Sequence, residues 1–373
     1  MKFSSIPGLN LTKRLLIDAV KNNHTPHAQL FVGGDGALNL PLSLAYATYL
    51  HCLNRGEEDA CGTCSACSKN LKFIHPDTHF VFPLSNIKGD KDEERFKADI
   101  MKSWRSFLLE QPFGNLNDWT SFYGGEDKQA LISRDESREI IKTLSLKPFE
   151  SQYKVMIIWQ PELMHPSAAN GILKILEEPA AHTYFVLVTN AADKLLPTIL
   201  SRTQIVSIPM LEDGEVENQL IGQGVDPNKA KKIATLAEGN LNAALKSIDS
   251  TEDDNTSRFM EWMRACFKKS YTTLVRLSEG YHALDKLSQK TLMAYSMNIL
   301  RETLLTLSGA KTINRLQGEE LKFVQDFGNV MSVEKIDKSF LLMNEASYHL
   351  ERNGSAKMIF LDLSLKLSKI INP

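Results

Sequence analysis

The first half of the sequence alternates short apolar segments with stretches whose apolar residues recur at helical spacing, and no other feature restricts the fold as strongly. Strands that are buried on both faces and joined by helices are typical of a parallel sheet. A helix is expected at residues 167–176, ended by Pro179, and another after Ser133, whose spacing to Glu136 resembles a capping box. Five strands are expected, at residues 29–32, 78–82, 155–159, 184–189 and 204–207. The sequence therefore predicts an α/β domain over residues 1–209.

The pattern changes after Pro209, where the strand signals end and only helical spacing remains. Residues 210–252 are expected to form a small helical module, and residues 253–373 a third, all-helical domain. The polar stretch at residues 249–257 is interpreted as a linker near their boundary. Residues 88–128 are charged and interrupted but rich in aromatic side chains, so we expect a surface insertion packed on the core.

Composition and charge exclude several classes of protein. With 43% hydrophobic and 24% charged residues, the 373-residue chain has the composition of a globular protein and not of a disordered one. The 43 Lys+Arg and 45 Asp+Glu leave a formal net charge of -2, which gives no overall attraction to nucleic acid. The longest apolar runs are strand-sized, and the N-terminus lacks the apolar stretch of a secretory signal. We therefore expect a soluble, cytoplasmic protein with no membrane partner.

Four of the five cysteines lie in one short segment, at Cys52, Cys61, Cys64 and Cys67. In a reducing compartment this clustering favours a metal site over disulfides. Four thiolates complete the tetrahedral shell of Zn²⁺ and leave no open position for water, so a structural zinc module is expected at residues 52–67. Reduced cysteines without metal are the alternative. The remaining cysteine, Cys266, is expected to be a small core residue.

The strand at residues 29–32 leads into a glycine-rich turn that lacks the groups needed to bind a nucleotide. A phosphate loop has Gly, four residues, then Gly-Lys-Ser/Thr, because the Lys neutralises phosphate and the hydroxyl binds magnesium. Here Gly33 and Gly36 are retained, but Leu38, Asn39 and Leu40 occupy the positions of the second Gly, the Lys and the hydroxyl residue. No ATP or Mg²⁺ is therefore expected in this degenerate loop.

The strand at residues 155–159 shows a second loss. An ATPase presents an Asp for magnesium and a Glu that activates water at the end of this strand, where the chain has Trp159 and Gln160. Glu162 lies beyond the strand and is expected to be a solvated residue at a helix start. Two independent losses argue against hydrolysis by this chain.

Further motifs follow in order along residues 3–245. Residues 170–179 read Asn-Gly-Ile-Leu-Lys-Ile-Leu-Glu-Glu-Pro, Thr189-Asn190 ends the next strand, and Leu200-Ser201-Arg202-Thr203 precedes the last one. Together with the degenerate phosphate loop and the four-cysteine module, they resemble the AAA+ module of bacterial clamp-loader subunits, specifically the delta-prime family of DNA polymerase III. The resemblance implies a RecA-like parallel sheet, a small helical lid at residues 210–252 and an all-α C-terminal oligomerisation collar at residues 253–373.

The resemblance also implies a function and partners. Members of the delta-prime type do not hydrolyse ATP themselves and help to load the sliding clamp on primed DNA as part of the DNA polymerase III holoenzyme. The partners would be ATPase subunits of the gamma/tau type and the delta subunit, with the sliding clamp contacted indirectly and DNA through the complex. Asn242 stands where the lid of active members presents an arginine, and Thr203 replaces the Cys of the family's Ser-Arg-Cys motif.

Arg202 is the expected functional residue. By the resemblance it would act in trans as an arginine finger in the ATP site of a neighbouring subunit, with Ser201 and Thr203 fixing the backbone beneath it. The alternative for this residue is an arginine that closes a helix against its own dipole. Two alternative functions stay open: an active clamp-loader-type ATPase with an unorthodox phosphate loop, and a zinc-dependent DNA-binding protein.

Overall fold

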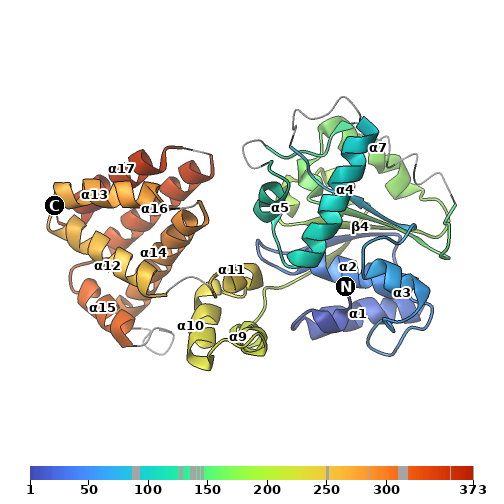
Figure 1. Ribbon diagram of the computed structural model, residues 1–373, viewed down its shortest axis with the longest axis horizontal. Coiled ribbons are helices and arrows are strands. Elements are labelled where there is room, and N and C mark those ends of the chain that lie inside the picture. Colours follow the sequence, from blue (N-terminus) through green and yellow to red (C-terminus); the bar gives the residue numbers. More distant parts are fainter. Residues whose placement is uncertain are drawn as a thin grey trace. The chain divides into compact units, whose positions relative to one another are not determined.

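The computed structural model describes residues 1–85, 93–125, 129–134, 140, 143, 147–248, 252–284, 286–309, 318–352 and 354–372. Within it the chain forms two compact units, Met1–Leu245 and Lys246–Pro373, here called the N-terminal and C-terminal units. Figure 1 shows strands and helices in the first and helices in the second. The finer division of residues 1–252 into an α/β domain and a lid stays a prediction.

Five parallel strands form the sheet of the N-terminal unit, in the spatial order β2-β3-β4-β1-β5. Each lies within one residue of its predicted bounds, so the α/β fold class is confirmed. The strands are β1 (Ala28–Val32), β2 (Thr78–Val81), β3 (Lys154–Trp159), β4 (Thr183–Thr189) and β5 (Gln204–Ser207).

Helices cover both faces of this sheet. On one face Leu30 of β1 belongs to the same buried cluster as Ile172 of α7 (Pro166–Glu177), the helix predicted at residues 167–176. On the other face the ring of Phe31 lies 5.9 Å from that of Tyr46 of α2 (Asn39–His51). Because successive strand residues point to opposite faces, both faces need apolar residues, which explains the nearly continuous apolar strands.

The insertion contributes aromatic side chains to the core. It contains α4 (Glu93–Glu110) and α5 (Leu116–Phe122). Trp104 and Trp119 are fully buried, and the Trp104 ring stacks 4.2 Å from Phe82 and lies 5.3 Å from Trp159. The predicted packing on the core is confirmed, whereas the helices were not predicted. Residues 88–92 and 126–128 of the insertion, and most of the helix predicted after Ser133, lie outside the described residues.

Short helices complete the N-terminal unit. Those that precede the last strand are η1 (Phe3–Ser5), α1 (Asn10–Lys21), α3 (Ser65–Asn70), η2 (Pro161–Leu163), η3 (Ala192–Lys194) and α8 (Pro197–Leu200). Those that follow it, where a helical module was predicted, are α9 (Asp213–Gly222), α10 (Pro227–Ala237) and α11 (Leu241–Lys246).

The described part of the C-terminal unit is helical, as predicted. Its helices are α12 (Glu252–Phe267), α13 (Tyr271–His282), α14 (Lys286–Leu307), α15 (Gly318–Gly328), α16 (Val333–Glu351) and α17 (Ala356–Ile371). In its core the Phe360 ring stacks on Trp262 and on Tyr281, each at 4.4 Å. Cys266 is fully buried, as expected. Within the described ranges, no helix is both long and apolar enough to cross a bilayer.

The predicted linker at residues 249–257 is wrong over its second half, because α12 begins at Glu252. Thr256 forms hydrogen bonds with Tyr295 at 2.9 Å and with Glu320 at 2.9 Å, so this part of the stretch packs into the helical unit. The physical reason is that acidic residues, which resemble a linker by composition, also favour the first turn of a helix.

Candidate functional site

All five strands run in the same direction, so their carboxyl ends meet at one edge of the sheet, where open α/β sheets bind ligands. Gly33, Gln160 and Asn190 come directly after β1, β3 and β4. The degenerate phosphate loop begins at the first of these residues. The structure therefore brings the three motifs together at the place where an ATPase would hold its nucleotide.

Asn39, at the position of the phosphate-loop lysine, is turned inward. It begins α2 and is only 3% exposed. Its Nδ2 donates to the backbone oxygen of Thr189 at 2.9 Å and to Oδ1 of Asn190 at 3.1 Å. Its Oδ1 accepts from the backbone N–H of Leu40 at 3.1 Å. A neutral amide thus fills the lysine position and is bonded to the chain itself.

Asn190 extends this network across the sheet. Its Oδ1 also accepts from Nε2 of Gln160 at 3.1 Å, and its Nδ2 donates to the backbone oxygen of Gly34 at 2.9 Å. The amide network, defined here as Asn39, Gln160 and Asn190, ties the loop to the ends of β3 and β4. It uses polar groups that would otherwise be available to a ligand.

The space over the loop is taken by a residue that precedes α11. Gly36 has a φ of +87°, and a Cβ there would lie 2.1 Å from Cγ of Asn240. Glycine is therefore required both by the left-handed backbone and by the close approach of this side chain. Leu38 and Leu40 are buried. The loop thus lacks the lysine and the hydroxyl ligand for magnesium. In addition, the Asn240 side chain fills the space beside Gly36.

Glu162 lies at a helix start, in η2, as predicted, but it is half-buried and not fully solvated. The carboxylate accepts from Oγ1 of Thr189 at 2.8 Å and from the backbone N–H of Asn190 at 3.4 Å. Burial raises its pKa, which favours the neutral form. The cause is the left-handed backbone of Gln160, with φ +56°, which turns the chain into η2 and brings Glu162 against β4. No motif in the sequence signals this turn.

Asn242, at the position of the lid arginine, is 9% exposed and donates from Nδ2 to Oδ2 of Asp118 at 2.7 Å. This bond joins α11 to α5, so the residue holds two segments of this chain together. It carries no charge that could reach a phosphate.

Arg202 lies between α8 and β5, and its side chain is 30% exposed. Nε donates to Oε1 of Glu177 at 2.6 Å, and Nη2 forms an ion pair with the same oxygen. Nη1 donates to the backbone oxygen of Thr198 at 2.9 Å and to Oγ of Ser201 at 3.1 Å. The contact with Glu177 at the end of α7 was missed by sequence reasoning.

The two neighbours of Arg202 bind the preceding helical turn. Oγ of Ser201 donates to the backbone oxygen of Thr198 at 3.2 Å, and Oγ1 of Thr203 donates to the backbone oxygen of Ile199 at 3.0 Å. Both hydroxyls therefore bond to α8, beside the backbone that carries the arginine.

The four clustered cysteines converge, with all Sγ atoms within 4.8 Å of one another. The backbone N–H of Cys61, Cys64 and Cys67 donates to Sγ of Cys52, Cys61 and Cys64, at 3.3, 3.4 and 3.4 Å. Backbone N–H donation from Cys64 and Thr63 lowers the pKa of the Cys61 thiol to about 6, which favours the thiolate. Four sulfur donors at this spacing fit a closed tetrahedral site.

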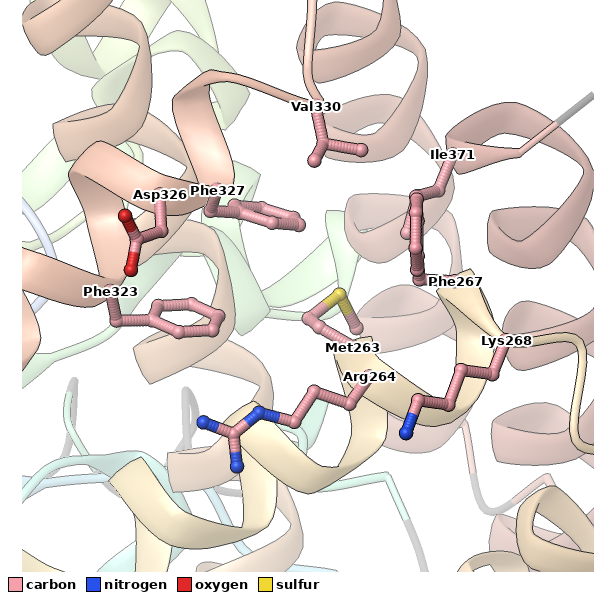
Figure 2. Close-up of a pocket in the computed structure, with 9 residues that line it drawn as sticks. All are labelled: Met263, Arg264, Phe267, Lys268, Phe323, Asp326, Phe327, Val330 and Ile371. Carbon is pink, nitrogen blue, oxygen red and sulfur yellow. The ribbon is translucent and has the colours of Figure 1, made fainter.

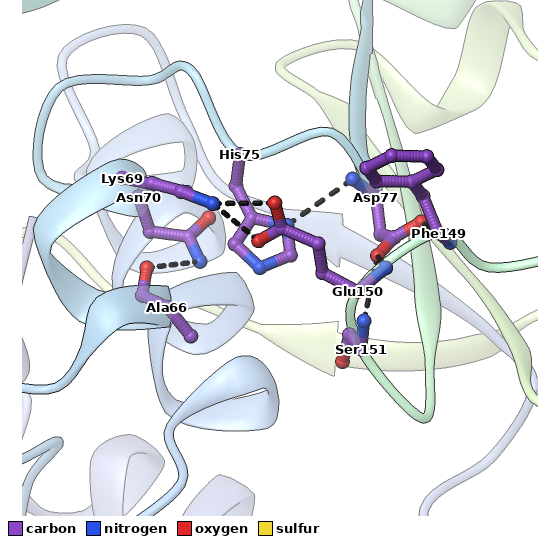
Figure 3. A network of polar contacts seen from close by, with 8 residues as sticks. All are labelled: Ala66, Lys69, Asn70, His75, Asp77, Phe149, Glu150 and Ser151. Carbon is purple, nitrogen blue, oxygen red and sulfur yellow. Dashed lines mark hydrogen bonds and ion pairs between the residues drawn. The ribbon is translucent and has the colours of Figure 1, made fainter.

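A polar network anchors the cysteine module to the sheet (Figure 3). Asp77 is 1% exposed and accepts from the backbone N–H of Phe149, Glu150 and Ser151 at 2.5, 2.8 and 2.8 Å. Burial alone would raise the pKa of Asp77, but these three bonds lower it overall. Lys69 of α3 forms an ion pair with Glu150. The amino end of the sheet thus keeps a buried carboxylate with a structural role.

His51 and His75 also lie in this network. Their rings stack at 4.2 Å, and Nδ1 of His51 lies 2.8 Å from Oγ of Ser151. Burial lowers the pKa of His51 to about 3, so the imidazole is neutral at physiological pH. The two rings belong to the packing beside the cysteine module.

The C-terminal unit has a groove of about 220 Å³ between α12, α15 and the end of α17. Figure 2 shows that Phe323, Phe327 and Met263 face this space, with Arg264 and Lys268 along one side. The basic residues lie near the end of α12, where cations offset the helix dipole. The groove lining holds one carboxylate, Asp326, and no thiol, hydroxyl or imidazole.

Comparisons with known proteins identify the family of this chain. The family model described as "DNA polymerase III, delta subunit" matches residues 9–212. The DNA polymerase III subunit delta' of Bacillus subtilis (strain 168) is 28% identical over 270 residues, 72% of this chain and 64% of that protein. The DNA polymerase III subunit gamma/tau of Mycoplasma pneumoniae is 24% identical over 268 residues, 69% of this chain and 32% of that protein. The chain thus matches less than two thirds of the length of either relative.

Among solved structures, a DNA polymerase III gamma subunit-related protein of Thermotoga maritima MSB8 is 15% identical. It covers 95% of this chain and 99% of its own, with a TM-score of 0.40, which is too low to support a comparison of the folds.

Proposed function

This chain belongs to the DNA polymerase III, delta subunit family, and from that premise we propose that it is a clamp-loader subunit of the delta-prime type that does not hydrolyse ATP. It would help to load the sliding clamp on primed DNA in the cytoplasm as part of the polymerase III holoenzyme. The observation that carries this proposal is the amide network, in which the chain's own polar groups bond to one another at the strand ends where an ATPase would hold its nucleotide.

Chemistry supports the absence of hydrolysis. Phosphoryl transfer needs a cation against the phosphates and carboxylates that hold Mg²⁺ and orient water. Asn39 supplies no charge, Trp159 offers no oxygen ligand and Gln160 only a neutral amide, and Glu162 is engaged with Thr189. An active ATPase with an unorthodox loop would need a replacement for each of these groups.

Arg202 is the group through which this subunit would act on ATP. Its planar guanidinium stays charged at physiological pH and can stabilise the charge of a transferring phosphoryl group. Its position on an exposed turn, with Ser201 and Thr203 bonded to α8, suits a cation presented to a neighbour. The neighbours would be ATPase subunits of the gamma/tau type, with the delta subunit elsewhere in the complex, and the C-terminal unit would serve as the oligomerisation collar.

The test is ATP hydrolysis by a complex reconstituted with a motif-intact AAA+ subunit. Arg202→Ala should slow hydrolysis at the contacted site on the order of 10³-fold, because an arginine supplied in trans has an effect of this size. Assembly, measured by size-exclusion chromatography, should not change. Lys174→Ala on the exposed face of α7 is the matched control and should leave hydrolysis unchanged. Normal turnover with Arg202→Ala would remove the proposed finger.

We also propose that Cys52, Cys61, Cys64 and Cys67 hold a structural Zn²⁺, which would cross-link the segment around α3. Elemental analysis of purified protein should give one zinc per chain. Cys64→Ala should lose the metal, whereas Cys266→Ala, which removes a buried thiol of the other unit, should retain it. A Cys64→Ala protein with unchanged zinc content, or a metal-free parent protein of unchanged stability, would contradict the assignment.

A further inference from the structure

We propose that Glu177 masks Arg202 in the free chain, so that the ATP of a neighbouring subunit must displace this carboxylate before the arginine can act. The inference rests on the proposed role of Arg202 as a finger and adds a residue that regulates its availability. It starts from the contacts of the guanidinium in the N-terminal unit.

A guanidinium can bind two phosphate oxygens along either of two edges, and in Arg202 both edges already donate hydrogen bonds within the chain. A guanidinium has five N–H donors, and two of them side by side make a bidentate contact. Nε and Nη2, which form one edge, both donate to Oε1 of Glu177. On the other edge Nη1 donates to the backbone oxygen of Thr198 and to Oγ of Ser201. Bidentate binding of phosphate therefore requires that one set of contacts opens.

Glu177 is the partner that must leave. Thr198 and Ser201 are neutral acceptors on the same turn as Arg202, so they move with it. Glu177 instead reaches across from the end of α7, and its side chain is 48% exposed. A carboxylate and a phosphate placed against one guanidinium repel each other, and both compete for the same donors. Arrival of the phosphate and departure of Glu177 are thus coupled.

The effect of such a mask is bounded by the strength of an exposed ion pair. The apparent affinity of a ligand falls by the fraction of the protein that is ready to bind it. Exposed pairs are weak and are screened by salt, which limits the reduction to about two- to five-fold at low ionic strength. The contact with Glu177 therefore raises the ATP concentration that is needed before Arg202 can bind the phosphates in the neighbour's site.

Glu177→Gln in the reconstituted complex tests the proposal, because it removes the charge and keeps the shape. The kcat/KM for ATP should rise about two- to five-fold, mainly through a lower KM, since the arginine is then free in a larger fraction of complexes. The difference from the parent should shrink as salt is added. Glu178→Gln is the matched control, because it makes the same charge change on the next, exposed residue and should have no effect.

An unchanged or lower kcat/KM in Glu177→Gln would overturn the mask, and so would a rise that persists when Arg202→Ala is also present. If Arg202→Ala slows hydrolysis but Glu177→Gln does not raise kcat/KM, only the mask is wrong. If Arg202→Ala has no effect, the finger is wrong and the mask falls with it.

Discussion

At the carboxyl end of the sheet the polar side chains are neutral amides bonded to one another, whereas at the amino end a buried carboxylate is held by backbone N–H groups. Asn39 and Asn190 represent the first end, and Asp77 the second. Even Glu162, which lies at the carboxyl end, has its pKa raised by burial. The buried side chain at the lysine position is therefore a neutral amide, whereas the buried carboxylate at the amino end is charged and held by the backbone.

The difference follows from the cost of burying charge. An ionised group inside a protein is stable only when it is paired or fully hydrogen-bonded. Asp77 receives three backbone N–H bonds, so it stays ionised at little cost. The two oxygens that accept from Asn39, on Thr189 and Asn190, are neutral, so a lysine at position 39 would gain no anion from these partners. A neutral amide is therefore the stable side chain at this buried position when no phosphate is bound.

Placing a cation at the carboxyl end should have the largest effect on stability. Asn39→Lys should lower the free energy of unfolding by about 3 kcal/mol or more, because the ammonium loses water without gaining an anion. Urea denaturation followed by circular dichroism measures the change. Asn22→Lys, at an exposed position, should stay within about 0.5 kcal/mol of the parent. An Asn39→Lys protein as stable as the parent would show that the cleft accepts a cation, and the contrast between the two ends would fail.

Removing the charge at the amino end should have a smaller effect. Asp77→Asn should lower the free energy of unfolding by about 1–3 kcal/mol near neutral pH, because the amide cannot accept all three N–H bonds. The control at the carboxyl end is Asp35→Asn. Because Asp35 is exposed, this substitution should change the free energy of unfolding by no more than about 0.5 kcal/mol. If Asp77→Asn and Asp35→Asn lowered the free energy of unfolding equally, the proposed structural role of the Asp77 carboxylate would be wrong.

The pH dependence of the free energy of unfolding gives a second test of the role of Asp77. Its pKa in the folded protein is lowered from the ordinary value of 3.8, so the unfolded chain takes up this proton more readily. The stabilisation is then fully present above that value and is lost as the pH falls through the folded-state pKa. The stability difference between the parent and Asp77→Asn should therefore be constant from about pH 5 to 7 and diminish below about pH 4. A difference that grows with acidity would contradict the assignment.

The sequence predicted the strands well because their apolar runs are set by burial on both faces, a local and periodic signal. It predicted the cysteine cluster because the spacing of the thiolates is itself local. It also identified the altered residues of the phosphate loop, since each stands at a definite motif position. These features need no knowledge of distant contacts.

The remaining features depend on contacts between distant segments. The Asn39–Asn190 bond joins residues 151 positions apart, and no local pattern predicts it. The aromatic side chains of residues 88–128 predicted packing on the core, but not the particular contact of Trp104 with Trp159, which lies 55 positions away. The burial of Glu162 follows from one left-handed residue, and the Glu177–Arg202 ion pair joins two motifs that were read separately. Tertiary packing decides each of these.

We expect the carboxyl end of the sheet, where the amide network lies, to bind no nucleotide. Isothermal titration of the isolated, metal-replete chain with Mg-ATP tests it most directly, with a motif-intact AAA+ subunit as the positive control. We expect heats no larger than those of dilution at millimolar ATP. Saturable one-to-one binding, accompanied by ATP hydrolysis in the same sample, would contradict the account.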